Sequence, residues 1–252
     1  MDGHRKIVKS AGRVFAVLEY FAEIMRPASA VEIRTHLDLP ASSTSALLGS
    51  LVDLGYLHYD PRRRVYQPTI RVGFLGDGVQ TGGSLRSLLE DLKHQTRQLV
   101  VLGARCQLNA QYIQVVRASH SRPVRRGTLA PLTRTAVGLV LMSKIADPDI
   151  NRLVTRINAA ERPEQRVPSS RLIEDIHAVR EDGFSFCYGQ VTPGVGAIGM
   201  PLPSSDDQPP IVLAVSGSGE RFVEQRNDIV GAMRERIERY GRELRAGAAS
   251  LS

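Results

Sequence analysis

The chain has 252 residues, of which 42% are hydrophobic and 23% are charged, and its formal net charge is +7. This composition is that of a folded globular protein, which excludes an intrinsically disordered chain, and the length suggests two domains. No apolar run approaches the ~20 residues of a membrane helix, and the N-terminus lacks the apolar segment of a secretory signal. We therefore expect a cytoplasmic protein with no membrane partner, and the basic excess allows a nucleic-acid partner.

The first 72 residues have the pattern of three short helices followed by a hairpin. Apolar side chains recur at helical spacing over about residues 12–25 and 41–54. Between these segments, residues 29–32 have the form of a capping box that opens another helix. Two strand-like pieces, 56–59 and 65–67, follow, and the turn that joins them carries three arginines. This order predicts a winged helix-turn-helix domain.

The charge distribution of this domain predicts a DNA-binding surface. The N-terminal residues of a recognition helix reach base edges in the major groove, and here they are small hydroxyl side chains without Lys or Arg. Phosphate contacts must then come from the N-terminal arm (Arg5, Lys6, Lys9 and Arg13) and from the hairpin turn. A Ser/Thr cluster or an Arg-rich turn alone is usually a helix cap or a solvated turn, but together and in this order they favour DNA. The predicted DNA-binding residues are Ser42, Ser43, Thr44, Ser45, Arg13, Arg62, Arg63 and Arg64.

The remaining sequence predicts a linker and an α+β domain. A glycine-rich linker is expected over 73–83, between a DNA-binding domain at 1–72 and a second domain at 84–252. A helix begins at Ser84, and its apolar face, Leu85–Leu92, together with the glycine-rich linker is the expected dimer region. Strands and helices then mix without strict alternation up to a closing helix. The predicted strands are 100–102, 112–116, 184–188, 197–202 and 211–216, and the predicted helices are 135–144, 150–158, 171–181 and 224–244.

Short motifs along nearly the whole chain resemble the IclR family of bacterial transcriptional regulators, and their order and spacing carry the resemblance. In the first domain they include Leu39-Pro40-x-Ser42-Ser43-Thr44 and Gly55-Tyr56-Leu57. In the second they are Gly127-x-x-x-Pro131-Leu132-x-x-Thr135-Ala136-x-Gly138, Asp182-Gly183-Phe184, Pro193-Gly194-Val195 and Val215-Ser216-Gly217.

The resemblance implies a winged helix-turn-helix, a linker helix and a C-terminal effector domain of GAF/profilin-like fold. It implies homodimers or homotetramers that bind palindromic double-stranded DNA operators. It also implies that these regulators repress or activate transcription under the control of a small-molecule effector, often a carboxylic or aromatic acid. Two positions that are often Cys and Lys in the family are Ala197 and Leu139 here, so we expect a less polar pocket and a larger, more apolar acid. The effector-binding residues that the resemblance implies are Thr135, Ala136, Val137, Gly138, Cys187, Ala197, Ala214 and Ser216.

No arrangement of residues predicts catalysis, a cofactor or a metal site. The histidines lack metal-ligand spacing, and Cys187 is interpreted as a small buried hydrophobic residue. The GxGxxG match at 194–199 does not join a strand to a helix, and Ser216 lacks the preceding glycine of a hydrolase elbow. Three alternatives stay open: an enzyme whose first domain serves assembly, a regulator-like protein whose pocket binds no small molecule, and a winged-helix module that binds a protein. The basic arm and turn favour DNA.

Overall fold

The computed structural model describes residues 9–73, 75, 84–118, 123–204 and 208–249. By its internal contacts the chain forms two compact units, residues 1–78 and 79–252, and the division between them falls inside the predicted linker. Most of that linker lies outside the described residues, as do Arg5 and Lys6 of the predicted N-terminal arm.

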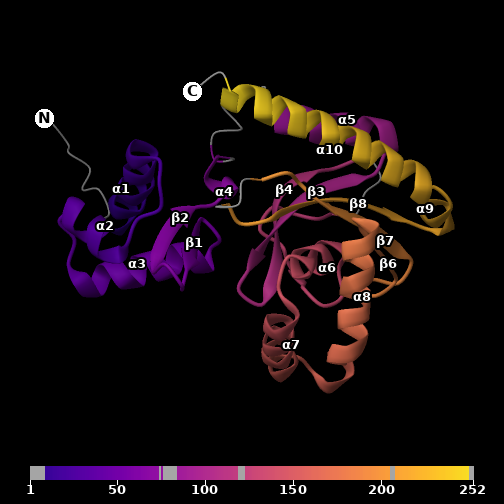
Figure 1. The fold of residues 1–252 in the computed structure, drawn as a ribbon, viewed down its shortest axis with the longest axis horizontal. Coiled ribbons are helices and arrows are strands. Elements are labelled where there is room, and N and C mark those ends of the chain that lie inside the picture. Colours follow the sequence, from indigo (N-terminus) through magenta and orange to yellow (C-terminus); the bar gives the residue numbers. More distant parts are fainter. Residues whose placement is uncertain (1–8, 74, 76–83, 119–122, 205–207, 250–252) are drawn as a thin grey trace, which may run out of the picture. The chain divides into compact units, whose positions relative to one another are not determined.

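In the described part of unit 1, three helices precede an antiparallel hairpin, in the predicted order, and a short fourth helix follows it (Figure 1). The first helix begins about one turn earlier than predicted, because its first turn is exposed and so carries no apolar periodicity. The elements are α1 (Lys9–Ile24), α2 (Ala30–His36), α3 (Ala41–Asp53), β1 (Leu57–Asp60), β2 (Val65–Pro68) and the short α4 (Ile70–Gly73).

One apolar core, drawn from α1, α2, α3 and β1, holds this unit together. The predicted capping box is confirmed, because the Ser29 hydroxyl oxygen accepts the N–H of Glu32 at 3.2 Å. The loop before α2 also joins the hairpin, since Ala28 and Tyr66 exchange two backbone hydrogen bonds. The hairpin is thereby fixed to the helix-turn-helix as a wing.

Unit 2 is an α+β domain, as predicted, built on a six-stranded antiparallel sheet in the order β5-β4-β3-β8-β7-β6 (Figure 1). A bulge interrupts the pairing of β3 and β4 between Leu102 and Gly103, and bulges increase the local twist of a sheet. Strand β5 was not predicted, because three residues are too few to show an alternating pattern. The strands are β3 (Leu99–Cys106), β4 (Asn109–Val116), β5 (Leu129–Pro131), β6 (Ser185–Tyr188), β7 (Val195–Pro201) and β8 (Ile211–Ser218).

Helices cover both faces of this sheet (Figure 1). Helices α5 and α10 pack together on one face, and α6 and α8 pack on the other with α7 beside them. The closing helix is preceded by a separate short helix, α9, that the sequence did not predict. The helices are α5 (Ser84–Thr96), α6 (Ala136–Ser143), α7 (Asp147–Ala160), α8 (Ser169–Asp182), α9 (Glu220–Glu224) and α10 (Arg226–Ala249).

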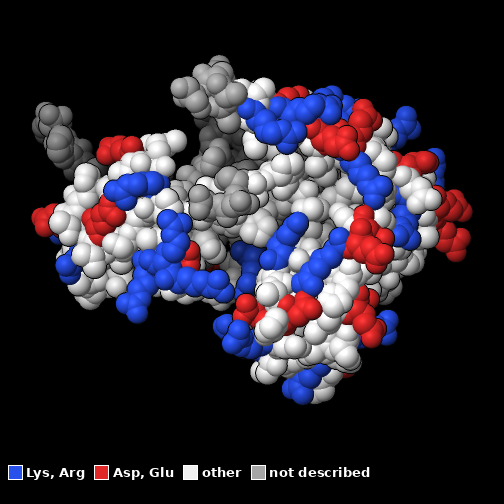
Figure 2. Space-filling model, in the orientation of Figure 1, with Lys and Arg blue, Asp and Glu red and all other residues white. Residues whose placement is uncertain are grey.

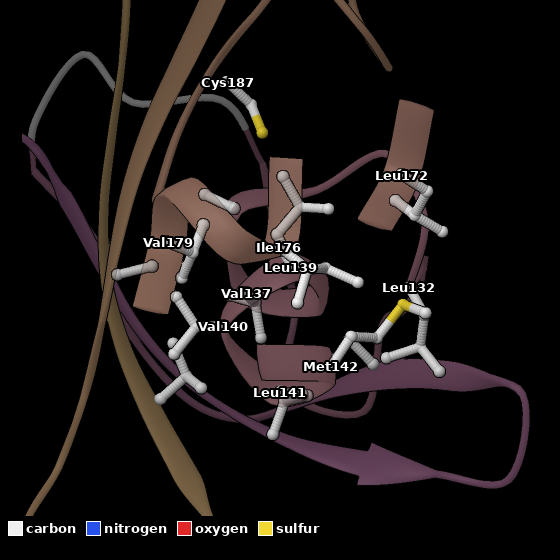
Figure 3. Packing of buried hydrophobic residues seen from close by; sticks show 14 of the residues in the cluster. Leu132, Val137, Leu139, Val140, Leu141, Met142, Leu172, Ile176, Val179 and Cys187 are labelled. Carbon is white, nitrogen blue, oxygen red and sulfur yellow. The ribbon is translucent and has the colours of Figure 1, made fainter. Parts of the chain in front are cut away.

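Helix α6 lies at the centre of the core on its face of the sheet. Residues 136–142 are all buried, as expected for a helix that is apolar on every side. Figure 3 shows Leu172, Ile176 and Val179 of α8 around it, with Cys187 at the margin of the same cluster. The start of α6 is thereby held rigidly against the sheet.

The structure corrects the predicted dimer region on α5. Leu88, Leu89 and Leu92 are at most 1% exposed, because they pack against the sheet and α10 of the same chain. Asp91 on the same helix pairs with Arg239 of α10 at 2.5 Å. The apolar stripe of α5 is therefore used within the subunit. Within the described part of the chain, no helix is long and apolar enough to cross a membrane.

Candidate nucleic-acid interface and ligand cavity

The first turns of α3 carry hydroxyl groups in two environments. Ser42 and Ser45 are exposed, and Ser43 is half-buried and donates to the carbonyl of Pro40 at 3.0 Å. Thr44 is only 1% exposed and donates to the same carbonyl at 2.9 Å. The structure thus corrects the prediction for Thr44, whose side chain lies on the core side of the helix with that of Leu48, four residues on. It is not available to a DNA partner.

The wing presents its three arginines, Arg62, Arg63 and Arg64, on the outside of one tight turn. Asp60 shapes this turn, because its carboxylate accepts the N–H groups of Arg62 at 2.8 Å and Arg63 at 3.2 Å. These hydrogen bonds, that of Arg63 above all, hold the pKa of the Asp60 carboxyl below its usual value. Arg64 adopts a left-handed φ of 55° that closes the turn.

Further cations come from the start of α1, where Lys9 is exposed and Arg13 half-exposed. Figure 2 shows Lys and Arg side chains gathered over the β1–β2 hairpin. Apart from Thr44, every predicted DNA-binding residue is at least partly exposed on unit 1. Exposed cations suit phosphate contacts, and exposed hydroxyls suit both phosphates and base edges.

Unit 2 contains a cavity of about 920 Å³ on the face of the sheet where α6 begins. This volume lies in the range of small-molecule sites. Its walls come from the central strands, the first turn of α6 and the segments that follow α5 and β6. Seven of the eight predicted effector residues line it, namely Thr135, Ala136, Val137, Cys187, Ala197, Ala214 and Ser216.

Strand register brings four of the lining residues into one row across the sheet. Leu99 of β3 pairs with Ser216 of β8, Ser216 with Ala197 of β7, and Ala197 with Cys187 of β6. Directly paired residues point to the same face of a sheet, so the row forms a continuous floor. The floor is mainly apolar.

The start of α6 forms one end of the cavity. The Thr135 hydroxyl accepts the N–H of Gly138 at 3.1 Å and donates to the carbonyl of Pro131 at 2.7 Å, so it is occupied on both sides. Within the described residues, the N–H groups of Ala136 and Val137 have no hydrogen-bond partner. Free amides at a helix start suit a carboxylate.

Gly138 does not line the cavity, which corrects its predicted role. A Cβ atom there would lie 2.1 Å from the carbonyl oxygen of Leu132, so the position serves close packing. Gly103 acts in the same way below α6, where a Cβ would lie 2.3 Å from a methyl carbon of Val137. Both glycines hold α6 close to its surroundings.

The charged side chains of the cavity lining are all positive. They are Arg97, Arg134 and Arg221, and no Asp or Glu is among the described lining residues. Nη2 of Arg134 lies 3.6 Å from the Glu161 carboxylate and 3.5 Å from the Gln165 side-chain oxygen. Its Nε is buried and has no hydrogen-bond partner in the described part of the chain. The cavity therefore favours an anion.

The sequence predicted a less polar pocket than is usual in the family because of Ala197 and Leu139, but only one of these two residues lines the cavity. Ala197 lines the cavity, but Leu139 is packed in the core and does not. Burial raises the pKa of Cys187 to about 12, so the thiol is neutral, in agreement with its interpretation as a buried hydrophobic residue. Burial also raises the pKa of Tyr112, which offers a neutral hydroxyl to the same space.

The glycine pattern at 194–199 serves packing, as interpreted from the sequence. Gly194 has a φ of 70°, and a Cβ at Gly196 would lie 2.5 Å from the ring of Phe222. The Ser216 hydroxyl donates to the carbonyl of Gly196 at 2.8 Å. These residues form neither a dinucleotide loop nor a nucleophile elbow.

The polar cavity residues that sequence reasoning missed include Arg97, Tyr112, Arg134 and Arg221. Arg134 had a usable signal, because it directly precedes Thr135 in the motif that pointed to the cavity. The other three lie in segments far from that motif. The pairing of β4 with β3 brings Tyr112 to the cavity, and the packing of α5 against β3 and of α9 against β8 brings Arg97 and Arg221.

Two family models match the chain. The model for the IclR helix-turn-helix domain matches residues 10–61, and the model for the bacterial transcriptional regulator IclR C-terminal domain matches residues 83–242. Together they cover the three helices and the first strand of unit 1, and the whole cavity lining of unit 2.

Individual relatives are similar over most of their length. The HTH-type transcriptional regulator TsaQ1/TsaQ2 of Comamonas testosteroni is 24% identical over 95% of this chain and 90% of its own. XynR of Escherichia coli, also an HTH-type transcriptional regulator, is 21% identical over 83% and 86%. The crystal structure of an IclR family transcriptional regulator from Brucella abortus has a TM-score of 0.56 at 22% identity, covering 95% of this chain and 94% of that one. These likenesses agree with the fold described above.

Proposed function

Because the chain belongs to the IclR family and is a helix-turn-helix transcriptional regulator rather than an enzyme, we propose how it recognises DNA and what controls it. It acts in the cytoplasm as a homodimer or homotetramer on a palindromic operator. A small organic acid, carboxylic or aromatic, binds the cavity of unit 2 and controls operator binding.

For DNA, the proposal assigns base contacts to Ser42, Ser43 and Ser45 of α3 and phosphate contacts to Arg13 and the wing arginines 62–64. Support comes from the exposure of these residues and from the Asp60 hydrogen bonds that hold the wing turn. Hydroxyl groups discriminate bases weakly, so the cations supply most of the affinity, and that share depends on salt.

For the effector, the observation that carries the proposal is the charge of the cavity. Arginines enter the lining from three separate segments of the chain, no carboxylate accompanies them among the described lining residues, and two free amides lie at the start of α6. An acid offers the complementary charge and can accept bidentate hydrogen bonds from an arginine.

Selection of bound fragments from genomic DNA, repeated at two salt concentrations, tests the DNA part. We expect a palindromic motif. For each phosphate contact, its association constant should fall by about 0.9 logarithmic units per tenfold rise in salt concentration. No enrichment at either concentration would contradict the proposal. The selected site is then titrated with organic acids, and an acid that changes the operator Kd is the expected effector class.

A further inference from the structure

The cavity has cationic groups at two separate places. One lies at the start of α6, with Arg134 and the amides of Ala136 and Val137. The other lies where β3 begins and β8 ends, with Arg97 and Arg221. We call these the α6 pole and the strand-end pole. A ligand that fills the cavity would meet both.

The β3 strand gives the distance between the poles. The first turn of α6 lies over Gly103, as the close approach of Val137 shows, whereas Arg97 is next to the start of the strand at Leu99. Four residues of strand separate Gly103 from Leu99, which is about 13 Å. The backbone segments that carry the two poles are therefore about 13 Å apart along the sheet, which suits a ligand longer than a single carboxylate.

The space between the poles is mainly apolar. Leu99, Val101, Ala197 and Ala214 line it, together with the neutral thiol of Cys187. An apolar stretch of this kind suits the carbon skeleton of a ligand rather than a further charge.

The strand-end pole differs from the α6 pole, where Arg134 lies 3.6 Å from the Glu161 carboxylate. No ion pair joins Arg97 or Arg221 to a carboxylate within the described residues. Arg97 lies in a basic stretch, because residues 92–146 contain nine Lys and Arg and no Asp or Glu, whereas Arg221 has Glu220 and Glu224 on its own short helix. Two guanidinium groups that line the cavity in this way suit a second anionic group of a ligand.

We propose that the cavity takes an extended dianion, with one acidic group at Arg134 and the α6 amides and the other at Arg97 and Arg221. This rests on the proposed function, since it takes the cavity as the effector site, and it narrows the effector from an organic acid to one that carries acidic groups at both ends. The carbon chain between them lies over the floor of Leu99, Ala197 and Cys187.

Calorimetric titration of the full chain with matched acids tests the proposal. The dianions adipate, suberate and sebacate are compared with the monoanions hexanoate, octanoate and decanoate. At the best-fitting length we expect the dianion to bind about tenfold more tightly or better, because the second group adds hydrogen bonds to charged donors. Equal Kd values for each pair, or no binding by any dianion, would overturn the proposal.

Variants separate the two poles. Arg221→Gln should weaken the dianion and leave the monoanion unchanged, whereas Arg134→Gln should weaken both. Arg171→Gln, at an exposed position of α8 outside the cavity lining, is the matched control and should change neither. If Arg221→Gln weakened both acids equally, the strand-end pole would not be a second acid site. Arg221 is exposed, so this variant should fold even if Arg134→Gln does not.

Operator binding by the same preparation distinguishes this inference from the proposed function. A protein that binds its operator but shows no preference for dianions contradicts only the inference. A protein that prefers dianions but selects no DNA contradicts the DNA part of the proposed function and leaves the inference standing.

Discussion

The two units present their proposed partners with different kinds of surface. In unit 1 the candidate DNA contacts are exposed or partly exposed side chains on two helices, α1 and α3, and on one tight turn. In unit 2 the candidate ligand contacts come from segments between residues 95 and 225, and they enclose a space. Exposed contacts should be removable without unfolding the domain, whereas the cavity should depend on the packing of its walls.

The largest expected effect is at Gly138, which holds α6 against its preceding loop. Gly138→Ala places a Cβ 2.1 Å from the Leu132 carbonyl oxygen, and this atom belongs to the backbone and cannot easily move. We expect unit 2 to lose about 3 kcal/mol in free energy of unfolding, measured in urea. Gly231→Ala is the matched control, because nothing lies within 4 Å of its Cβ position on α10, and it should stabilise by about 0.5–1 kcal/mol. Equal effects at both positions would contradict the account of α6.

The next effect is on DNA binding by the wing. Replacing Arg62, Arg63 and Arg64 together by Ala should weaken binding to all DNA sequences and reduce the salt slope by about 0.9 for each phosphate that the wing no longer neutralises. The thermal midpoint should stay the same, because the three side chains are exposed. The salt series of the variant against the original protein measures the slope. An unchanged slope would show that the wing does not bind phosphates.

A smaller effect is expected for stability and DNA specificity at Thr44 and Ser45, which are neighbours on α3. Thr44→Ala should cost about 1 kcal/mol of stability in unit 1, because it removes a buried methyl group and the hydrogen bond to Pro40. Ser45→Ala should change stability by less than about 0.5 kcal/mol but alter which sequences are selected. Urea unfolding and repeated DNA selection measure the two effects. The reverse assignment, with specificity changed only by Thr44→Ala, would contradict the burial argument.

The smallest expected effect concerns the cavity floor. A Cys187 pKa raised to about 12 by burial means that the thiol is protonated at pH 8, with roughly one part in ten thousand ionised. Because the pKa is raised on folding, the neutral form stabilises the folded state below the unfolded pKa, and this contribution is lost as the pH rises toward 12. Iodoacetamide should therefore label Cys187 slowly in the native protein and fast in urea. Rapid labelling of Cys187 in the native protein at pH 8 would contradict the burial of its thiol.

Much of unit 1 could be predicted because its structure is local. The helix spacing, the Ser29 cap, the Asp60 turn and the arginine triplet each lie within a few residues, where backbone geometry follows directly from side-chain type. The prediction for Thr44 was wrong because its environment is not set locally. Its burial depends on which side of α3 meets α1 and α2, and a run of small hydroxyl residues carries no apolar periodicity to show this.

In unit 2 the motif around Thr135 located one end of the cavity but not its full lining. The α5 stripe was identified correctly as apolar, yet the sequence could not show that α10 of the same chain would cover it. Likewise, Leu139 and Gly138 lie in the right motif but point away from the cavity, into the core and toward Leu132.

By itself, the sequence determined the class of each segment, the two-part organisation and the resemblance to a regulator family, because hydrophobic period and turn chemistry are local properties. Only the tertiary structure decided which charged side chains line the same cavity. Arg97, Arg134 and Arg221 are far apart in the chain, and strand register with helix packing brings them to one space. Long-range pairing in an antiparallel sheet sets such distances, and no local pattern encodes them.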